Sequence, residues 1–219
     1  MMDTYILNEL EFMTLAASKG MHRVYGFVMK DQEQADDNEV YQTMYHMVQM
    51  GYMKAVNDGF VLSPEFNVLF QVIKDAGRVL WIRENDGNGS DRCCYLGEDH
   101  CVVTQLSSRD AKALKASLID TEHFEQYLYE EGSFLDSCVA EVIIEESCIE
   151  KAVEEFEEPL EGLQAVYELM DINNEQTIGS VWIQSLELED RIMVKSDVIR
   201  IWSYSKQKTI EEVMKLLGV

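Results

Sequence analysis

The sequence has no apolar run close to the roughly 20 residues that a membrane-spanning helix needs. Residues 1–5 include no basic stretch and no apolar stretch, so they do not resemble a signal peptide. Prolines number only two in 219 residues, and apolar residues make up 47%, which argues against disorder over most of the length. Together these absences predict a globular, cytoplasmic protein with no membrane insertion.

Cations are scarce, because 18 lysines and arginines stand against 41 aspartates and glutamates, for a net charge of −23. Such a charge repels nucleic-acid phosphates and anionic lipid surfaces. We therefore expect no nucleic-acid partner. Two interpretations of the charge remain open: plain solubility, which is the more general use, and attraction of a basic partner.

The sequence also lacks the spacing of cysteines, histidines and acids that metal-binding motifs require. The five cysteines form an odd set without a C-x-x-C pair, and Cys93 and Cys94 are adjacent, so on a strand they would face opposite sides. His100 and Cys101 do not complete a zinc set. The loop 86–91 superficially resembles a calcium loop, but position 97 is glycine where the closing glutamate is required. We expect reduced, buried thiols, with no metal site and no cofactor.

No catalytic pattern stands out. The four histidines are scattered, no G-x-S-x-G motif is present, and the carboxylates of Glu98, Asp99 and Asp171 form no pair in sequence. Catalysis by these carboxylates would require them to cluster in a cleft. The sequence therefore favours a binding protein with no catalytic residues.

Residues 1–76 predict a winged-helix-like region. Apolar spacing indicates helices over 7–19 and 37–50, and Gly51 ends the second of them. Two short apolar runs around Asn57-Asp58-Gly59 predict a hairpin. Ser63 and Pro64 then begin a third helix.

The rest of the chain predicts an α+β fold with two antiparallel β-meander sheets. Residues 77–120 contain strands and then a helix that follows Ser107 or Ser108 and includes Leu114 and Leu118. Residues 121–160 form an acidic helical segment, and residues 161–219 form the second meander and a terminal helix. The two meanders share a layout of strand, polar loop, strand, acidic turn and strand, which predicts a quasi-two-fold arrangement.

A winged-helix regulator with a C-terminal sensor region is the alternative function. Its recognition helix would be 37–50, which contains Asp37 and Glu39 but neither lysine nor arginine. Because phosphate neutralisation supplies most of the affinity for DNA, such a helix is poorly suited to the task. Salt-sensitive affinity for duplex DNA would distinguish this alternative.

Two segments are the candidate partner-binding sites. The polar loop 84–92 lies between strands, where binding residues often occur, and the helix predicted over 134–156 has a narrow apolar stripe. The candidate contact residues are Asn85, Asp86, Asn88, Asp91, Arg92, Val139, Val142, Ile149 and Val153. The methionines at 44, 47, 50 and 53, near three tyrosines, are interpreted mainly as core, with a partner groove as the lesser alternative.

The order of elements resembles the EspG-like chaperones of type VII secretion systems. The segments that carry the resemblance are the opening helix at 7–12, the helix end at 47–52, the proline segment at 61–66, the tryptophan strand at 181–183, and a leucine-bearing last helix. The acidic helical middle, 121–160, is a departure from the family pattern. The resemblance implies a non-catalytic protein of a single domain, 1–219. It further implies that this protein binds a small helical secreted protein, or a pair, in the cytoplasm.

Overall fold

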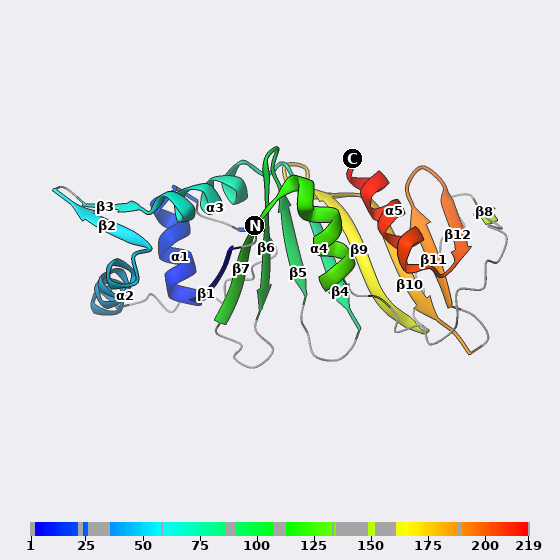
Figure 1. Ribbon diagram of the computed structural model, residues 1–219, viewed down its shortest axis with the longest axis horizontal. Coiled ribbons are helices and arrows are strands. Elements are labelled where there is room, and N and C mark those ends of the chain that lie inside the picture. The colour runs from blue at the N-terminus through cyan, green and yellow to red at the C-terminus, as the bar shows by residue number, and fades with distance from the viewer. Residues whose placement is uncertain are drawn as a thin grey trace. The chain divides into compact units, whose positions relative to one another are not determined.

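The computed structural model describes residues 3–21, 24–25, 36–57, 59–85, 91–106, 113–132, 134, 149–151, 161–187 and 190–218 (Figure 1). In these residues the chain is α+β, with five α-helices and a large antiparallel sheet. None of the described helices is long and apolar enough to cross a bilayer.

Two compact units make up the chain. Unit 1 comprises residues 1–76 and 95–121, and unit 2 comprises residues 77–94 and 122–219. The chain passes from one unit to the other three times: between residues 76 and 77, within the strand β5 (Arg92–Leu96) and within the short helix η1 (Thr121–His123).

Unit 1 combines three helices, a separate hairpin and three paired strands. Strand β7 lies between β1 and β6 and pairs antiparallel with both. The elements are β1 (Asp3–Asn8), α1 (Glu9–Ser18), α2 (Asp37–Gln49), β2 (Met53–Val56), β3 (Gly59–Leu62), α3 (Pro64–Asp75), β6 (His100–Leu106) and β7 (Ala113–Asp120).

Local sequence explains how α1 begins. Asn8 Oδ1 accepts a hydrogen bond from the Glu11 backbone at 2.9 Å, and Glu11 Oε2 accepts one from the Asn8 backbone at 2.7 Å. This reciprocal capping box satisfies two amides that a helix start leaves unpaired. Phe12 and Leu15 on the inner face are fully buried, and the Phe12 ring packs 5.2 Å from that of Phe70 in α3.

Unit 2 is a sheet with helices on one face. Its strand order is β4-β9-β10-β11-β12-β8, all antiparallel. The elements are β4 (Arg78–Glu84), α4 (Phe124–Glu131), β8 (Ile149–Lys151), β9 (Leu163–Asp171), β10 (Gln176–Ser185), β11 (Asp190–Lys195), β12 (Ile199–Ser203) and α5 (Lys206–Leu217). Helices α4 and α5 pack on each other, and α5 also packs on β9 and β10 (Figure 1).

A glycine allows α5 to lie close to the sheet. A Cβ atom at Gly179 in β10 would lie 2.6 Å from Leu216 Cδ1 and 2.8 Å from the Lys195 carbonyl oxygen. Both distances are shorter than real Cβ contacts. The absent side chain at position 179 therefore sets how near α5 approaches β10 and β11.

Most predicted elements are confirmed, with three corrections. The helix predicted through Leu114 and Leu118 is wrong, because these residues lie in β7, and β1 was not predicted at all. The helix predicted over 134–156 is wrong at Ile149–Lys151, which is β8 and pairs with β12. The separation into two sheets is wrong because β4 and β9 pair along seven residues of each strand. The quasi-two-fold and winged-helix relations stay predictions.

Candidate functional site

Asn85, at the start of the predicted recognition loop, is exposed, and its amide is held by the neighbouring strand. Its Nδ2 donates to the Leu163 carbonyl oxygen at 2.9 Å, and its backbone N–H donates to the Gln164 carbonyl oxygen at 2.9 Å. Asp91, at the other end, is half-buried. Asp86 and Asn88 lie outside the described residues. The start of the loop is thus anchored to β9.

Arg92, another predicted contact residue, is buried. Its guanidinium donates to the Glu131 carbonyl oxygen at the end of α4 and pairs with the Glu84 carboxylate. It also bonds the hydroxyl of Tyr127, whose pKa burial raises to about 12. Arg92 therefore joins β4, β5 and α4, and this position suits holding the loop end in place better than direct contact with a partner.

Most of the apolar stripe predicted for the helix 134–156 lies outside the described residues. The candidate contact residues Val139, Val142 and Val153 are among those that are not described. Ile149 is described and lies in β8, opposite Ile201 of β12, with 55% of its surface exposed. Ile149 thus places exposed apolar surface on a three-residue strand at the end of the strand order.

Three aromatic rings of unit 2 lie beside the lysines at the start of α5. Lys206 Nζ lies 4.1 Å from the centroid of the Tyr129 ring and 4.9 Å from that of Phe134, and Tyr129 is 51% exposed. Lys208 Nζ lies 5.2 Å from the Trp202 centroid. Tyrosine is one of the residues enriched at the positions that contribute most to protein–protein binding. We call Tyr129, Phe134 and Lys206 the α4–α5 surface.

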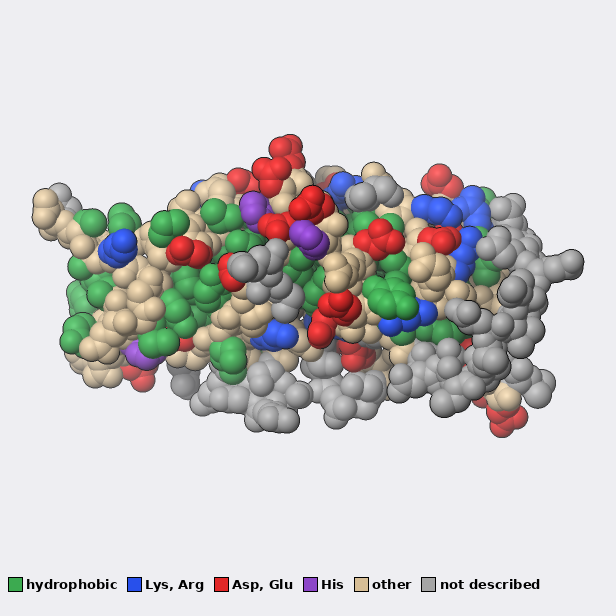
Figure 2. Space-filling view, viewed as in Figure 1, with side chains coloured by type: hydrophobic (Ala, Val, Ile, Leu, Met, Phe, Trp, Pro, Cys, Tyr) green, Lys and Arg blue, Asp and Glu red, His purple; other side chains and the backbone are tan. Residues whose placement is uncertain are grey.

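Charge is segregated along the chain, and the net charge of the whole sequence conceals this. Six of the 18 lysines and arginines fall in residues 191–219, together with only three of the 41 acids. This segment forms β11, β12 and α5, and Figure 2 shows blue side chains over these elements. A count of charge by segment, and not over the whole chain, would have found the basic region.

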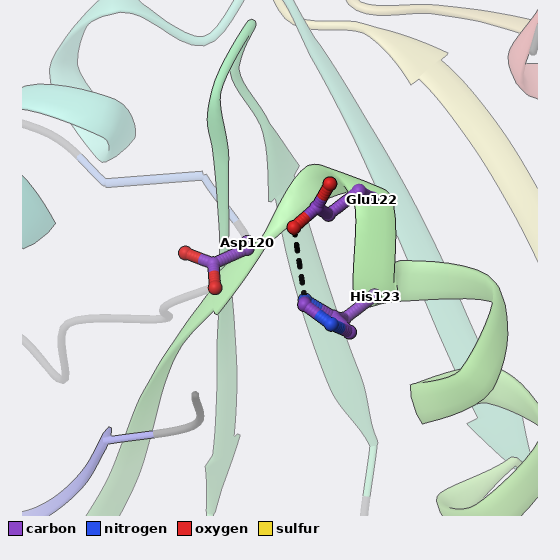
Figure 3. Close-up of side chains that lie close together, drawn as sticks. All are labelled: Asp120, Glu122 and His123. Atoms are coloured by element: carbon purple, nitrogen blue, oxygen red, sulfur yellow. Dashed lines mark ion pairs between the residues drawn. The ribbon is translucent and has the colours of Figure 1, made fainter.

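Three possible metal ligands lie close together where β7 leads into η1 (Figure 3). One ligand atom each from Asp120, Glu122 and His123 lies within 4.8 Å of the others. Glu122 Oε1 is 3.8 Å from His123 Nδ1, and Asp120 Oδ1 is 3.6 Å from His100 Nε2. Because Glu122 and His123 are exposed, and the carboxylates already pair with imidazoles, the group is an ordinary surface arrangement of charges.

The described thiols are buried and poor nucleophiles. Burial, with the nearby Asp91 charge, raises the pKa of Cys93 to about 12, and burial also raises the pKa of Cys101. Cys94 is fully buried. Because the thiolate is the reactive form, these side chains serve as small apolar fillers. Cys138 and Cys148 lie outside the described residues.

Asp171, one of the carboxylates considered for catalysis, holds a turn in place. Asp171 accepts backbone hydrogen bonds from Asn173 at 2.8 Å and Asn174 at 3.1 Å, and the Asn174 bond lowers its pKa. The one buried acid in unit 1 among the described residues, Glu11, lines a shallow cleft with His46 but is used in capping α1. Each of these groups has a structural role.

No protein-family model and no curated protein matches the sequence. The fold is similar to that of the Mycobacterium tuberculosis type VII secretion system chaperone EspG5, solved in complex with a PE25–PPE41 dimer. The TM-score is 0.60, and the match covers 98% of this chain and 96% of that chain at 10% identity. The chain therefore has the fold of this chaperone, as the resemblance in the sequence implied.

Proposed function

We propose that the protein is a cytoplasmic chaperone that binds a helical substrate of a type VII secretion system, as a single protein or as a pair, and performs no catalysis. The observation that carries the proposal is the fold, which matches that of EspG5 over almost the entire length of both chains. Fold alone does not imply function. The surface chemistry of unit 2 therefore supplies the second part of the argument.

The α4–α5 surface suits the recognition of a partner helix. Tyr129 and Phe134 offer apolar area, and Lys206 places a cation against both rings. An amphipathic helix binds through an apolar face, while charges beside that face select the partner. The basic character of residues 191–219 favours a substrate with acidic side chains beside its apolar face. Asn85 and Ile149, both exposed on unit 2, are further proposed contacts.

The alternative of a DNA-binding regulator receives no support from α2. The helix begins with Asp37 and Glu39, and its exposed positions include Tyr41 and Tyr45. We expect no mobility shift of duplex DNA by the purified chain at physiological salt. A shift that weakens steeply as salt increases would favour the regulator instead.

Affinity capture tests the proposal directly. A tagged copy of the chain, expressed in its native host, should retain a small α-helical protein or pair that is also found outside the cell, in a defined stoichiometry after gel filtration. Remixing of the purified components should restore the complex. Recovery of the chain alone at all concentrations would contradict the proposal.

A pair of charge-reversal variants then locates the surface. Lys206→Glu should weaken the remixed complex by about tenfold, because it removes the cation that faces the two rings. Lys74→Glu, which makes the same charge change at the end of α3 in unit 1, is the control and should leave affinity within about twofold.

A further inference from the structure

The largest concentration of exposed apolar side chains lies in unit 1, away from the α4–α5 surface in sequence. Of the eleven large apolar residues that are exposed in the described part of the chain, six lie between positions 41 and 61. They are Tyr41, Tyr45, Met50, Val56, Phe60 and Val61, and we call them the α2–hairpin patch. Figure 2 shows hydrophobic side chains over the region that α2, β2 and β3 occupy in Figure 1.

Helix α2 contributes an aromatic face. Tyr41 and Tyr45 are four residues apart, so they lie next to each other on one side of the helix, and they are 69% and 66% exposed. Met47 is the only buried residue of the helix. A helix that faces only water normally carries charged residues on its outer side. Two exposed tyrosines side by side depart from that pattern.

The hairpin contributes an aliphatic face. Strands β2 and β3 pair with each other and with no further strand among the described residues. Lys54 lies opposite Val61 in the register, and because successive strand residues alternate faces, Val56 lies on the same side as both. The result is a two-stranded sheet with exposed valines on its outer side.

The patch rests on a packed base. Met53 at the start of β2 is buried, and the Tyr52 ring lies 4.5 Å from that of Phe66 in α3 and 6.5 Å from that of Tyr5 in β1. The Tyr52 backbone N–H also donates to the Met47 carbonyl oxygen at 2.9 Å, which connects α2 to the hairpin. A surface held in this way is ordered before a partner arrives, and so loses less entropy on binding.

The charges beside the patch select its occupant. Asp36, Asp37 and Glu39 are exposed at the start of α2, and Glu65 is exposed at the start of α3. Lys54 is the one lysine or arginine among the described residues of this segment, 36–66. A second copy of the chain would bring the same acidic rim and another net charge of −23, so the charges oppose self-association.

We propose that the α2–hairpin patch is a second docking surface, and that it takes a partner helix with an apolar face flanked by lysine or arginine. The apolar face would cover the tyrosines and valines, and the cations would lie beside the acids at the start of α2. The patch belongs to unit 1 and does not depend on the substrate proposed for unit 2. It allows the protein to hold one partner while contacting another.

Two synthetic helical peptides test the chemistry. Each has about 14 residues, which gives a helix of about 21 Å that matches the length of α2. Each places leucine on one face and either lysine or glutamate on the other. Anisotropy of a fluorescent label measures binding to the full chain, and circular dichroism confirms that every variant is folded.

The variants keep charge constant. Tyr41→Ser with Tyr45→Ser, and separately Val56→Ser with Val61→Ser, should each weaken binding of the leucine–lysine peptide by at least about tenfold. Ile178→Ser, at an exposed isoleucine of β10, is the control and should bind as the unchanged chain does. The leucine–glutamate peptide should bind at least about tenfold more weakly than the lysine peptide.

Four results would overturn the proposal. The first is that the unchanged chain does not bind the leucine–lysine peptide. The second is that the patch variants bind it as well as Ile178→Ser does, and the third is that the chain binds the two peptides equally. The fourth is a dimer of the chain alone, seen by sedimentation, that the patch variants abolish, which would assign the surface to a second copy.

Discussion

Helices α2 and α5 are almost equal in length, at 13 and 12 residues, but they are used in different ways. Helix α5 lies on the sheet of unit 2 and buries five side chains, including Ile210 and Val213. Helix α2 packs on α1 and β2 and buries only Met47. The comparison shows that one amphipathic helix completes a core, whereas the other leaves two tyrosines exposed.

Truncation of one large side chain in each helix should give the largest difference in the free energy of unfolding. Ile210→Ala in α5 should lower the free energy of unfolding by about 2–4 kcal/mol, since it leaves a cavity against the sheet. Tyr45→Ala in α2 should change it by no more than about 0.5 kcal/mol, because the ring is exposed. Urea denaturation measures both. Equal losses would mean that α2 is packed as tightly as α5.

A larger side chain at position 179 tests how closely α5 packs against β10. Gly179→Val should cost about 1–3 kcal/mol, because the added carbons would meet Leu216 and the Lys195 carbonyl oxygen. Gly51→Val, at the end of α2, is an instructive comparison. A Cβ there meets nothing, so any loss reflects only its φ of +78°. Thermal unfolding separates the two, and a smaller loss at Gly179 would contradict the close approach.

Buried Glu212 predicts a pH effect that is confined to α5. Glu212 lies 2.7 Å from Lys215 Nζ and 3.5 Å from Lys208 Nζ, and its hydrogen bond raises the pKa of Lys215. A raised pKa means that this stabilisation is complete below the unfolded pKa of about 10.4 and is lost as pH rises through the folded value. Urea midpoints should therefore fall above about pH 10.

Glu212→Gln supplies the control for that pH effect. The variant should lower stability at neutral pH and should show a smaller further loss above about pH 10. The same alkaline loss in both proteins would assign the effect to other groups, such as the tyrosines.

Removal of the helix caps should give the smallest effects. Ser205 accepts from the Lys208 backbone at 3.3 Å, and Asp36 accepts from the Asn38 backbone at 3.3 Å. Replacement of either by alanine should cost about 0.5–1 kcal/mol. Amide exchange should increase in the first turn of the altered helix, and in α2 the increase should stay local because the helix buries one residue. A global increase after Asp36→Ala would contradict that view of α2.

The predictable parts of the fold are those with local signals. Pro64 marked the start of α3, and the turn around Gly59 marked the hairpin, because a proline in the first helical turn and a glycine turn are signals that span only a few residues. Ser63 lies at the N-cap position but makes no side-chain capping bond. Strand β7 was missed because Leu114 and Leu118 also fit a helical period, and a short apolar run does not distinguish the two structures. Pairing with β6 and with β1, which is distant in sequence, decides that it is a strand.

The candidate site was less predictable, for a related reason. The polar loop and the arginine beside it suggested a recognition element, but Arg92 became a buried link because its partners, Glu84 and the Glu131 carbonyl, come from other elements. Lys206, Tyr129 and Phe134 meet only after α4 and α5 pack together. A site assembled from separate helices has no motif in sequence.

Amide hydrogen exchange on the captured complex tests the proposed function most directly. The account predicts that the bound secreted protein slows exchange in α4 and α5, together with β8, relative to the free chain, and leaves α1 unchanged. Recovery of a complex with no slowed amides in unit 2, or failure to recover any helical secreted partner, would contradict it.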